Sequence, residues 1–368
     1  MRYLTNPSTD PHFNMAFDEA VLESLPLDEP VFYLWQNRPS VIIGRNQSAY
    51  AEVNLPFLES HGITLARRVT GGGAVYHDLG NLNYTIAGRT ADMDADLPRY
   101  LGLVADALRS LGVPAEVSGR NDILVEGRKC SGYAKRLSRD RMMIHGTLMF
   151  DVDLEMLTAA LAVPGSKLSA AGVASVRSRV ANLREYLPGM SLEDFRGAIH
   201  AFLAATPVGV VSLQVGGKNG LPCPQNNDSP AIGGKNGLPC TQSSDCRCAD
   251  CEMPLPEGFL QRVEQRAAAK FRTWEWIYGE SPATDFAFSR KFPSCGTVEA
   301  RFSVRHGRLE GLRFGGDFLG ALPAEELAAS LNGTRYDAEA LQARLSALPI
   351  PSYFDGLTAT DLLSLLLQ

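Results

Sequence analysis

Apolar side chains near the start of the chain recur every three or four residues over 13–21, which predicts an amphipathic helix. Apolar and β-branched runs at 31–35, 40–44 and 62–69 follow, and these predict strands. The first third of the chain is therefore expected to form a helix that leads into a sheet.

Two further helices are predicted by their start signals as well as by their apolar stripes. Over 97–111 apolar residues step by four and three, with acidic residues before the stripe and Gly112 after it. Ser191 and Asp194 have the spacing of a capping box and precede a second stripe over 192–202. Strand-like segments lie between these helices, at 122–127 and 142–153.

The periodic pattern stops between Gln214 and about Pro256, where Gly, Pro, Asn, Ser and Cys dominate. Within this stretch the decapeptide GGKNGLPCPQ, which begins at Gly216, returns as GGKNGLPCTQ at Gly233. Two copies are too few for a solenoid, and this composition buries little apolar surface. We interpret the stretch as an insertion within a folded domain.

Regular patterns return after the insertion. A helix is predicted over 259–279, and residues 296–314 alternate around His306 and Gly307 as in a hairpin. Helical segments complete the chain, at 324–331, 337–348 and 358–367. A small α+β domain is therefore expected from about Pro282 onward.

Composition and charge exclude several classes of protein. The 368 residues, 45% of them apolar, can bury a full core. With 35 basic and 41 acidic residues the net charge is −6, which argues against broad nucleic-acid binding. The N-terminus lacks the pattern of a signal peptide and no apolar run could cross a bilayer, so a cytoplasmic protein without a membrane partner is expected.

The segment LARRVTGGGAVYHDLGN, at 65–81, combines bare backbone with positive charge. Glycines let main-chain N–H groups approach an anion, although the spacing fits neither a P-loop nor a Rossmann motif. Three glycines alone are more typical of a bulge or a tight turn. Arg67 and Arg68 favour phosphate instead, because guanidinium groups suit phosphate oxygens.

A second basic segment lies between Arg120 and Arg141, with seven basic residues and three acidic ones. A charge run of this kind is often a solvated face. Here it surrounds the glycine-containing stretch GRKCSGYAKR, which we expect to expose its backbone. A lysine in this stretch could bridge a carboxylate and an α-phosphate and neutralise the charge that develops when one attacks the other.

Four segments of the chain are informative together, namely RRVTGGGAVYHDLGN, GRNDILVEGRKCSGYAKR, IHGTLMFDVDLEML and SVRSRVANLREYLPG. They occur in the order and approximate spacing of the lipoate–protein ligase A family, and the chain resembles that family over nearly its whole length apart from the insertion. The resemblance implies an α+β fold shared with biotin–protein ligases and octanoyltransferases. It implies a large mixed-sheet catalytic domain, residues 1–281, and a small α+β accessory domain, residues 282–368.

The resemblance also implies two half-reactions that use ATP, Mg²⁺ and (R)-lipoate. Lipoate and ATP give lipoyl-AMP and pyrophosphate, and the lipoyl group then passes to a lysine of an acceptor. The implied acceptors are the lipoyl domains of 2-oxoacid dehydrogenase E2 subunits and the glycine cleavage H protein. Since such domains tend to be acidic, we expect the basic segment to help dock them.

Site residues are carried over from the same resemblance. Arg68 and the run Gly73, Ala74, Val75 and Tyr76 match ATP contacts, and Lys129 matches the lysine that contacts both the nucleotide and the lipoyl carboxyl oxygen. Physical reasoning gives these residues the same tasks: Arg68 holds phosphate, the glycine backbone admits the acyl-adenylate, and Lys129 stabilises the reacting centre.

Further candidates carry less support. Asn121 and Asp122 suit Mg²⁺, which takes one or two protein oxygens beside phosphates, with Asp122 as the metal ligand. His77 is either a base or a structural histidine of its loop. The remaining candidates are Arg45, Gly71, Gly72 and His145.

Two other functions stay open on the sequence alone. Octanoyl- and lipoyltransferases share the scaffold but use a cysteine thioester and no ATP; Cys130 is the thiol that could serve, although a buried structural cysteine fits it better. An inactive lipoate- or nucleotide-binding protein is disfavoured by the presence of Lys129 and of the complete glycine segment.

Cysteines of the insertion could hold a metal, but a loop without a metal is favoured because paired C-x2-C knuckles are lacking. The four that could supply sulfur ligands are Cys240, Cys246, Cys248 and Cys251, and Cys223 also lies in the insertion.

Overall fold

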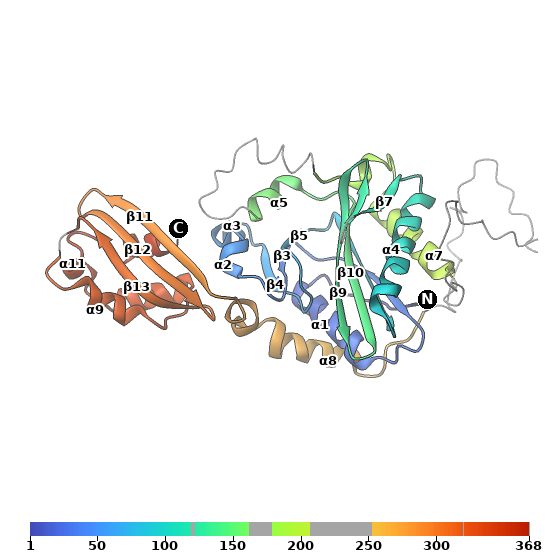
Figure 1. The fold of residues 1–368 in the computed structure, drawn as a ribbon, viewed down its shortest axis with the longest axis horizontal. Coiled ribbons are helices and arrows are strands. Elements are labelled where there is room, and N and C mark those ends of the chain that lie inside the picture. The colour runs from blue at the N-terminus through green and yellow to red at the C-terminus, as the bar shows by residue number, and fades with distance from the viewer. Residues whose placement is uncertain (119–121, 162–178, 207–251, 319, 368) are drawn as a thin grey trace, which may run out of the picture.

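The structure, a computed structural model, describes residues 1–118, 122–161, 179–206, 252–318 and 320–367. The molecule is elongated, with a large body and a smaller C-terminal body at one end (Figure 1). Mixed parallel and antiparallel strand pairing together with helices confirms the expected α+β class. The division at residues 281 and 282 stays a prediction; the sheet of the smaller body begins at Thr284.

A seven-stranded sheet forms the centre of the large body, with strand order β1-β2-β6-β10-β9-β8-β7. Only β1 and β2 pair in parallel among these strands. Their bounds are β1 Arg2–Tyr3, β2 Val31–Trp35, β6 Asn81–Arg89, β7 Ala115–Ser118, β8 Asp122–Val125, β9 Arg128–Ser138 and β10 Arg141–Met149. The predicted strands at 31–35, 122–127 and 142–153 correspond to β2, β8 and β10.

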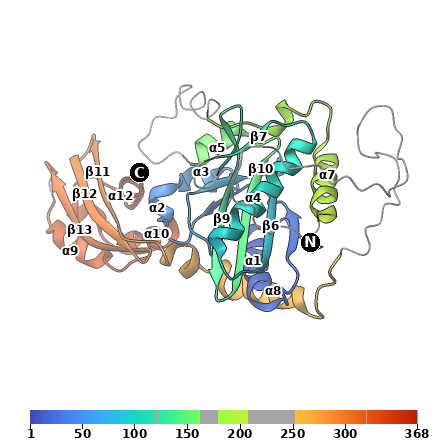
Figure 2. The same ribbon diagram turned by 45° about the vertical axis from the view of Figure 1, so that its right-hand side comes forward.

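Helices cover both faces of this sheet, so β2 is buried along its whole length. On one face Val31, Tyr33 and Trp35 join a core that includes α1 (Pro11–Ser24) and α8 (Phe259–Arg266). On the other face α4 (Met93–Ser110) and α7 (Leu192–Ala205) pack against Phe32 and Leu34, and Figure 2 shows α4 crossing this face. The helices predicted over 13–21, 97–111 and 192–202 are thus present, because each apolar stripe finds a sheet face to cover.

Hydrogen bonds of side chains to the backbone mark the starts of two of these helices. Asp10, which the sequence analysis did not single out, accepts a hydrogen bond from the His12 N–H at the beginning of α1. In α7 the Ser191 hydroxyl accepts from the Asp194 N–H while the Asp194 carboxylate accepts from the Ser191 N–H, so the capping box is confirmed.

A second, three-stranded sheet lies beside the first with order β4-β3-β5. The strands are β3 Ser40–Ile43, β4 Thr64–Arg67 and β5 Val75–His77; β3 runs parallel to β4 and antiparallel to β5. Short helices flank it, namely α2 Ala49–Glu52, α3 Leu55–Ser60 and α5 Leu154–Ala160. The three glycines lie in the connection that leads from β4 past β3 to β5.

The second basic segment is not the open glycine-rich backbone that the sequence suggested. It forms β9, an 11-residue strand paired with β8 and β10. Positive φ angles at Glu126 and Gly127, 50° and 76°, make the tight turn that joins β8 to β9. The glycines within 127–136 therefore serve a turn and a strand, and the sheet ladder holds the basic side chains in fixed positions.

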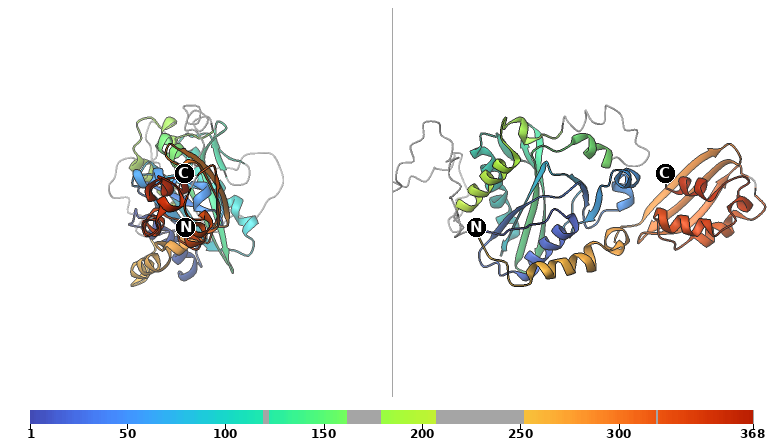
Figure 3. Two further views of the ribbon diagram at one scale, coloured as in Figure 1. Left: turned by 90° about the vertical axis from the view of Figure 1, so that its left-hand side faces the viewer. Right: turned by 180° about the vertical axis from the view of Figure 1, so that it is seen from behind.

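The smaller body contains β11 (Thr284–Phe292), β12 (Gly296–Arg305) and β13 (Arg308–Gly316). His306 and Gly307 form the predicted two-residue turn, with φ of 49° and 69°. Four helices complete the body, α9 Ala324–Leu331, α10 Ala338–Ser346, α11 Ile350–Tyr353 and α12 Ala359–Leu366. They enclose an apolar core of their own with the inner face of the sheet, and Figure 3 shows this body from two further sides.

The segment that leads to the smaller body departs from the single helix predicted over 259–279. After α8 the chain continues through π-helical turns at Ala267–Phe271 and Glu275–Gly279. The insertion at 214–256 lies mostly outside the described residues, but its last residues return to the core, where the Met253 N–H donates to the Tyr3 carbonyl. No helix within the described residues is long and apolar enough to cross a membrane.

Candidate active site

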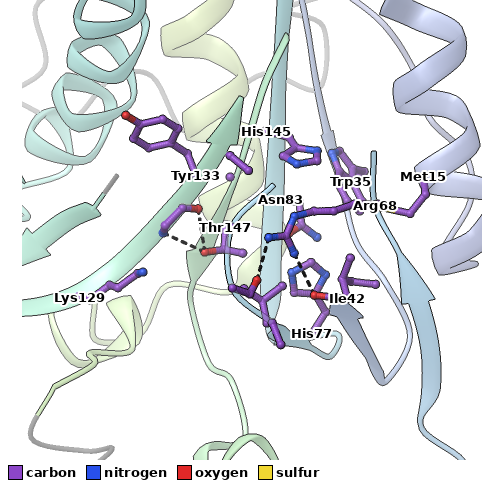
Figure 4. A pocket seen from close by; sticks show the side chains of 17 residues that line it. Met15, Trp35, Ile42, Arg68, His77, Asn83, Lys129, Tyr133, His145 and Thr147 are labelled. Carbon is purple, nitrogen blue, oxygen red and sulfur yellow. Dashed lines mark hydrogen bonds between the residues drawn. The ribbon is translucent and has the colours of Figure 1, made fainter. Parts of the chain in front are cut away.

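A cavity of about 130 Å³ lies between the glycine loop and the main sheet (Figure 4). Its lining comes from α1, β2, β3, β5, β6, β9, β10 and the loop. The lining residues are Met15, Trp35, Ile42, Arg68, Gly72, Gly73, Ala74, Val75, His77, Asn83, Lys129, Gly132, Tyr133, Ala134, His145, Gly146 and Thr147. Lys129 and the glycine loop, separated by more than fifty residues in sequence, thus share one cavity.

The two ends of the cavity differ in exposure. Residues at one end are exposed or half-buried, among them Gly72, Gly73 and Lys129. At the other end the side chains are buried, namely Met15, Trp35, Ile42, His77 and Asn83. Figure 4 shows Lys129 and Tyr133 on one side and Trp35 and Met15 on the other. We call these the open end and the closed end.

Of the three loop glycines, Gly72 alone has a positive φ, 96°, and a Cβ there would lie 2.9 Å from Arg68 Nη2. A Cβ on Gly71 or Gly73 would meet no atom within 4 Å. Gly44 in turn leaves room for the loop, because a Cβ added at this position would lie 2.1 Å from the Gly72 carbonyl oxygen. The open space at Gly73 is available to a ligand at the open end.

Arg68 shapes the loop from inside. Its guanidinium donates to the carbonyl oxygens of Gly71 (2.8 Å), Gly73 (2.8 Å) and Ile42 (3.0 Å). Burial lowers the pKa of Arg68 to about 10, so the group still carries its charge at neutral pH. The predicted contact between Arg68 and phosphate stays a prediction; what the structure shows is a cation that ties down the glycine backbone.

Arg67 does not serve as an anion ligand, contrary to the expectation drawn from the arginine pair. It is fully buried, and its guanidinium donates to the carbonyl oxygens of Gln47 (2.6 Å), Ile277 (2.7 Å) and Gly44 (3.1 Å), among others. Strand alternation explains the difference, because neighbouring residues at the end of β4 point to opposite sides. Arg67 therefore fastens the second sheet to the segment that leads to the smaller body.

Arg45 is likewise not among the residues that line the cavity. Its guanidinium lies 2.7 Å from a Glu280 carboxylate oxygen and 4.5 Å from the centre of the Trp276 ring. Gly71 and Tyr76 do not line the cavity either. The Tyr76 side chain is buried in β5, and burial raises the pKa of its phenol to about 12.

Lys129 lies near the start of β9 with its side chain 39% exposed. Its backbone is held by two hydrogen bonds to the neighbouring segment, from its N–H to the Arg179 carbonyl (2.8 Å) and to its carbonyl from the Ala181 N–H (2.9 Å). Its Nζ lies 2.7 Å from Asp122 Oδ1. The candidate Asp122 is thus next to Lys129, at the start of β8, whereas Asn121 lies outside the described residues.

His77 is a neutral side chain in the closed end. Its Nδ1 lies 3.0 Å from the Asn37 amide, and burial lowers its pKa to about 3, with the positive charge of Arg68 adding to the effect. A histidine with so low a pKa cannot act as a base near neutral pH. Of the two roles left open by the sequence, the structural one fits the geometry.

His145 also lines the cavity and is fixed on both ring nitrogens. Nδ1 lies 2.6 Å from Asp18 Oδ2, and Nε2 lies 2.8 Å from Thr70 Oγ1. Asp18, which is 1% exposed, also accepts from the hydroxyls of Tyr33 and Thr85. This buried network holds the ring of His145 in one orientation behind the glycine loop.

Cys130 has none of the features of an activated thiol. It is fully buried, its Sγ donates to the Ile123 carbonyl oxygen at 3.4 Å, and burial raises the pKa of the thiol to about 12. Cys295, the other cysteine within the described residues, is buried in the smaller body, and burial raises its pKa as well. The described part of the chain therefore offers no thiolate for a thioester mechanism.

Sequence reasoning did not anticipate several lining residues, including Met15, Trp35, Asn83 and Thr147. The alternation of apolar and polar residues in LNYTI, at 82–86, could have indicated that Asn83 faces away from the apolar side of the strand, because residues two apart on a strand face the same side. Asn83 and Thr147 lie directly opposite each other in the register of β6 and β10. Which strands become neighbours is a long-range property, and the local pattern does not encode it.

Residues 10–204 match the family model for the catalytic domain of lipoyl protein ligases A and B, and residues 281–366 match that for the C-terminus of bacterial lipoate protein ligases. The chain belongs to the lipoate–protein ligase family. It is therefore an enzyme of the ligase class, and the resemblance seen in its four motifs is confirmed.

Relatives in this family cover the whole chain. Lipoate–protein ligase 1 of Staphylococcus aureus (strain Mu50) is 33% identical over 369 residues, with 100% of each chain covered. A lipoate–protein ligase of Bacillus subtilis (strain 168) is 33% identical over 370 residues, again with 100% of each chain covered.

Solved structures of the family share this fold. The bipartite lipoate protein ligase of Thermoplasma acidophilum, studied with its E2 lipoyl domain, is 28% identical with a TM-score of 0.59, covering 76% of this chain and 96% of that one. A putative lipoate protein ligase from T. acidophilum with bound lipoic acid is 26% identical with a TM-score of 0.55, covering 76% and 98%.

Proposed function

We propose that this ligase activates lipoate with ATP at the open end of the cavity and then transfers the lipoyl group to a lysine of a lipoyl domain. One observation carries the proposal: Lys129 and the exposed backbone of Gly72 and Gly73 line the open end of the cavity, and the buried apolar side chains of Met15, Trp35 and Ile42 line its closed end. A fatty carboxylate fits this polarity with its charged group outward.

In the first half-reaction a lipoate carboxylate oxygen attacks the α-phosphorus of ATP, and the bond from that phosphorus to pyrophosphate breaks. Negative charge is concentrated on the α-phosphate during this step. Lys129 and the main-chain N–H groups beside Gly73 would stabilise it. Arg68 contributes by holding the loop in shape, since its donors are directed to loop carbonyls.

The ion pair between Lys129 and Asp122 has a part in this step. Without substrate, the carboxylate holds the ammonium at the open end of the cavity. Phosphate and carboxylate oxygens of the substrates compete with Asp122 for the same ammonium. We infer that binding transfers Lys129 from Asp122 to the substrates, which leaves the Asp122 carboxylate available to a cation.

Asp122 would hold Mg²⁺, and the residues fit that ion. Its carboxylate is 34% exposed, and the described residues contain no cluster of three acidic, histidine or cysteine side chains that could form a protein cage. Mg²⁺ characteristically binds one or two carboxylates together with substrate phosphates and water. When bound it would supply charge neutralisation on the phosphates.

In the second half-reaction the acceptor lysine, as a free amine, attacks the carbonyl carbon of lipoyl-AMP. The bond from that carbon to the AMP oxygen breaks, AMP leaves, and the ammonium proton is lost to solvent. Lys129 stabilises the carbonyl oxygen as it becomes negative. The exposure of Gly72, Gly73 and Lys129 gives the acceptor side chain access from outside.

The two alternatives receive less support from the site. A thioester mechanism requires a thiolate, and burial raises the pKa of the Cys130 thiol. A binding protein without activity does not need a lysine at the mouth of the cavity. We infer a cytoplasmic reaction, because it consumes ATP, and acceptors of the E2 lipoyl-domain and glycine cleavage H protein types.

Mass spectrometry of a lipoyl domain incubated with ATP, Mg²⁺, lipoate and this protein tests the proposal. We expect a mass increase of one lipoyl group that depends on ATP, and pyrophosphate release that depends on lipoate. Lys129→Ala should abolish both signals, and Lys135→Ala, on the same strand but paired with Asp94, should keep them. Modification without ATP, or full activity of Lys129→Ala, would contradict the proposal.

A further inference from the structure

Two hydrogen-bond donors in the closed end have no partner among the described residues. They are Nε2 of His77 and Nδ2 of Asn83, on side chains that are 3% and 1% exposed. Both residues line the cavity, from strands β5 and β6 of different sheets (Figure 4). A buried donor without an acceptor is unfavourable, and native structures rarely keep one without a reason.

The hydrogen-bond chain behind His77 fixes its tautomer. Asn14 Nδ2 donates to Asn37 Oδ1 at 2.7 Å, so the amide nitrogen of Asn37 faces His77. This nitrogen lies 3.0 Å from His77 Nδ1, which must accept. In a neutral imidazole the other nitrogen then carries the hydrogen. His77 therefore presents an N–H group at Nε2.

Asn83 is oriented in a similar way. Its Oδ1 accepts from Asn81 Nδ2 at 2.9 Å, which leaves its own amide nitrogen as the unpaired group. Its position opposite Thr147 in the sheet register places it in the wall of the cavity. Two strands from two sheets thus bring N–H groups into one buried compartment together with the apolar side chains of Met15, Trp35 and Ile42.

The polarity of the cavity determines which part of a fatty acid reaches these donors. The carboxyl group must react at the open end, beside Lys129, so the far end of the chain enters the closed end. The tail of octanoate ends in carbon and hydrogen and offers no acceptor. The dithiolane ring of lipoate carries two sulfur atoms, whose lone pairs are weak acceptors.

We propose that His77 and Asn83 recognise the dithiolane ring by donating hydrogen bonds to its sulfur atoms, and that they thereby select lipoate over fatty acids of the same length. The inference rests on the proposed function. A purely hydrocarbon tail leaves both donors unpaired in a dry compartment, whereas sulfur satisfies them. Because sulfur accepts weakly, we expect selectivity on the order of tenfold, far below that of a site built for a hydroxyl group.

The test compares lipoate with 5-cyclopentylpentanoate, which has the same ring size and chain and lacks sulfur. We measure kcat/KM for pyrophosphate release with both acids in the unmodified enzyme. Lipoate should be preferred by about tenfold. His77→Phe and Asn83→Leu should each reduce this ratio severalfold by lowering the value for lipoate, and His77→Gln, which keeps a donor, should restore part of it.

Controls separate the possible outcomes. Val75→Ala removes packing without removing a donor, so it should lower both values alike. Activity with the cyclopentyl acid shows that a variant is folded, and the Asn83 variant is an independent test on another strand. No pyrophosphate release with either acid would refute the proposed function. Release with equal efficiency for both acids, or a ratio unchanged in both the His77→Phe and the Asn83→Leu variant, would overturn only the recognition of the ring.

Discussion

The open and closed ends of the cavity are lined by different kinds of chemical group. At the open end, main-chain groups of Gly72 and Gly73 and the single ammonium of Lys129 meet solvent. At the closed end, buried side chains such as Trp35 and His77 are fixed by hydrogen bonds to their neighbours. The contrast teaches that phosphate chemistry depends on backbone and charge, while the choice of acyl group depends on side chains held in place by the core.

The largest expected effect comes from the open end. Lys129→Ala should slow the aminolysis of presynthesised lipoyl-AMP by about 10²–10³-fold, since one stabilising donor at a developing oxyanion is lost. Closed-end variants such as Asn83→Leu should change this step far less. Single-turnover transfer to a lipoyl domain measures it. If Lys129→Ala transferred lipoyl-AMP at the normal rate, the lysine would act in adenylation alone.

The glycine loop gives the next effect. Gly72→Ala forces a side chain onto a φ of 96° and toward Arg68, so we expect destabilisation of about 1–2 kcal/mol and a severalfold loss of activity. Gly71→Ala has open space and an ordinary φ and should change little. Urea denaturation and pyrophosphate release compare the pair. Equal stability in the two variants would show that the loop relaxes at no cost.

The sequence predicted the elements of the fold better than it predicted their neighbours. The α7 capping box and the His306–Gly307 turn are set by local groups, and both were correctly anticipated. The sequence did not predict that Arg67 and Arg68 have different environments, because these depend on where β4 ends and on which segments pack against it. The sequence also did not predict that Asn83 lines the site. That position depends on the pairing of β6 with β10, which lies about sixty residues further along the chain.

The low pKa of His77 predicts that the stability of the fold decreases with decreasing pH. In the unfolded chain a histidine binds a proton below about pH 6.5, whereas folded His77 stays neutral down to about pH 3. Between these values the unfolded state holds the extra proton, so the free energy of unfolding should fall by about 1.4 kcal/mol per pH unit as pH decreases. His77→Gln should lack this part of the slope. Urea unfolding of both proteins at pH 7.5, 5.5 and 4.5 measures how the difference in their free energies of unfolding changes from its value at pH 7.5.

The smallest effect concerns docking of the acceptor. The basic segment has a local excess of positive charge, but Arg128, Lys135 and Arg136 pair in the fold with Glu185, Asp94 and Glu19. This pairing leaves less charge for an acidic partner than the sequence count suggests.

Raising salt from 50 to 300 mM should therefore weaken lipoyl transfer to an acidic lipoyl domain by only about two- to threefold, because the remaining surface charges are screened over roughly one Debye length. Pyrophosphate release without acceptor should change less, since its charges meet inside the cavity. KM for the lipoyl domain at each salt concentration measures the effect. If both steps weakened equally, the salt would be acting on the open end itself and not on a docking surface outside it.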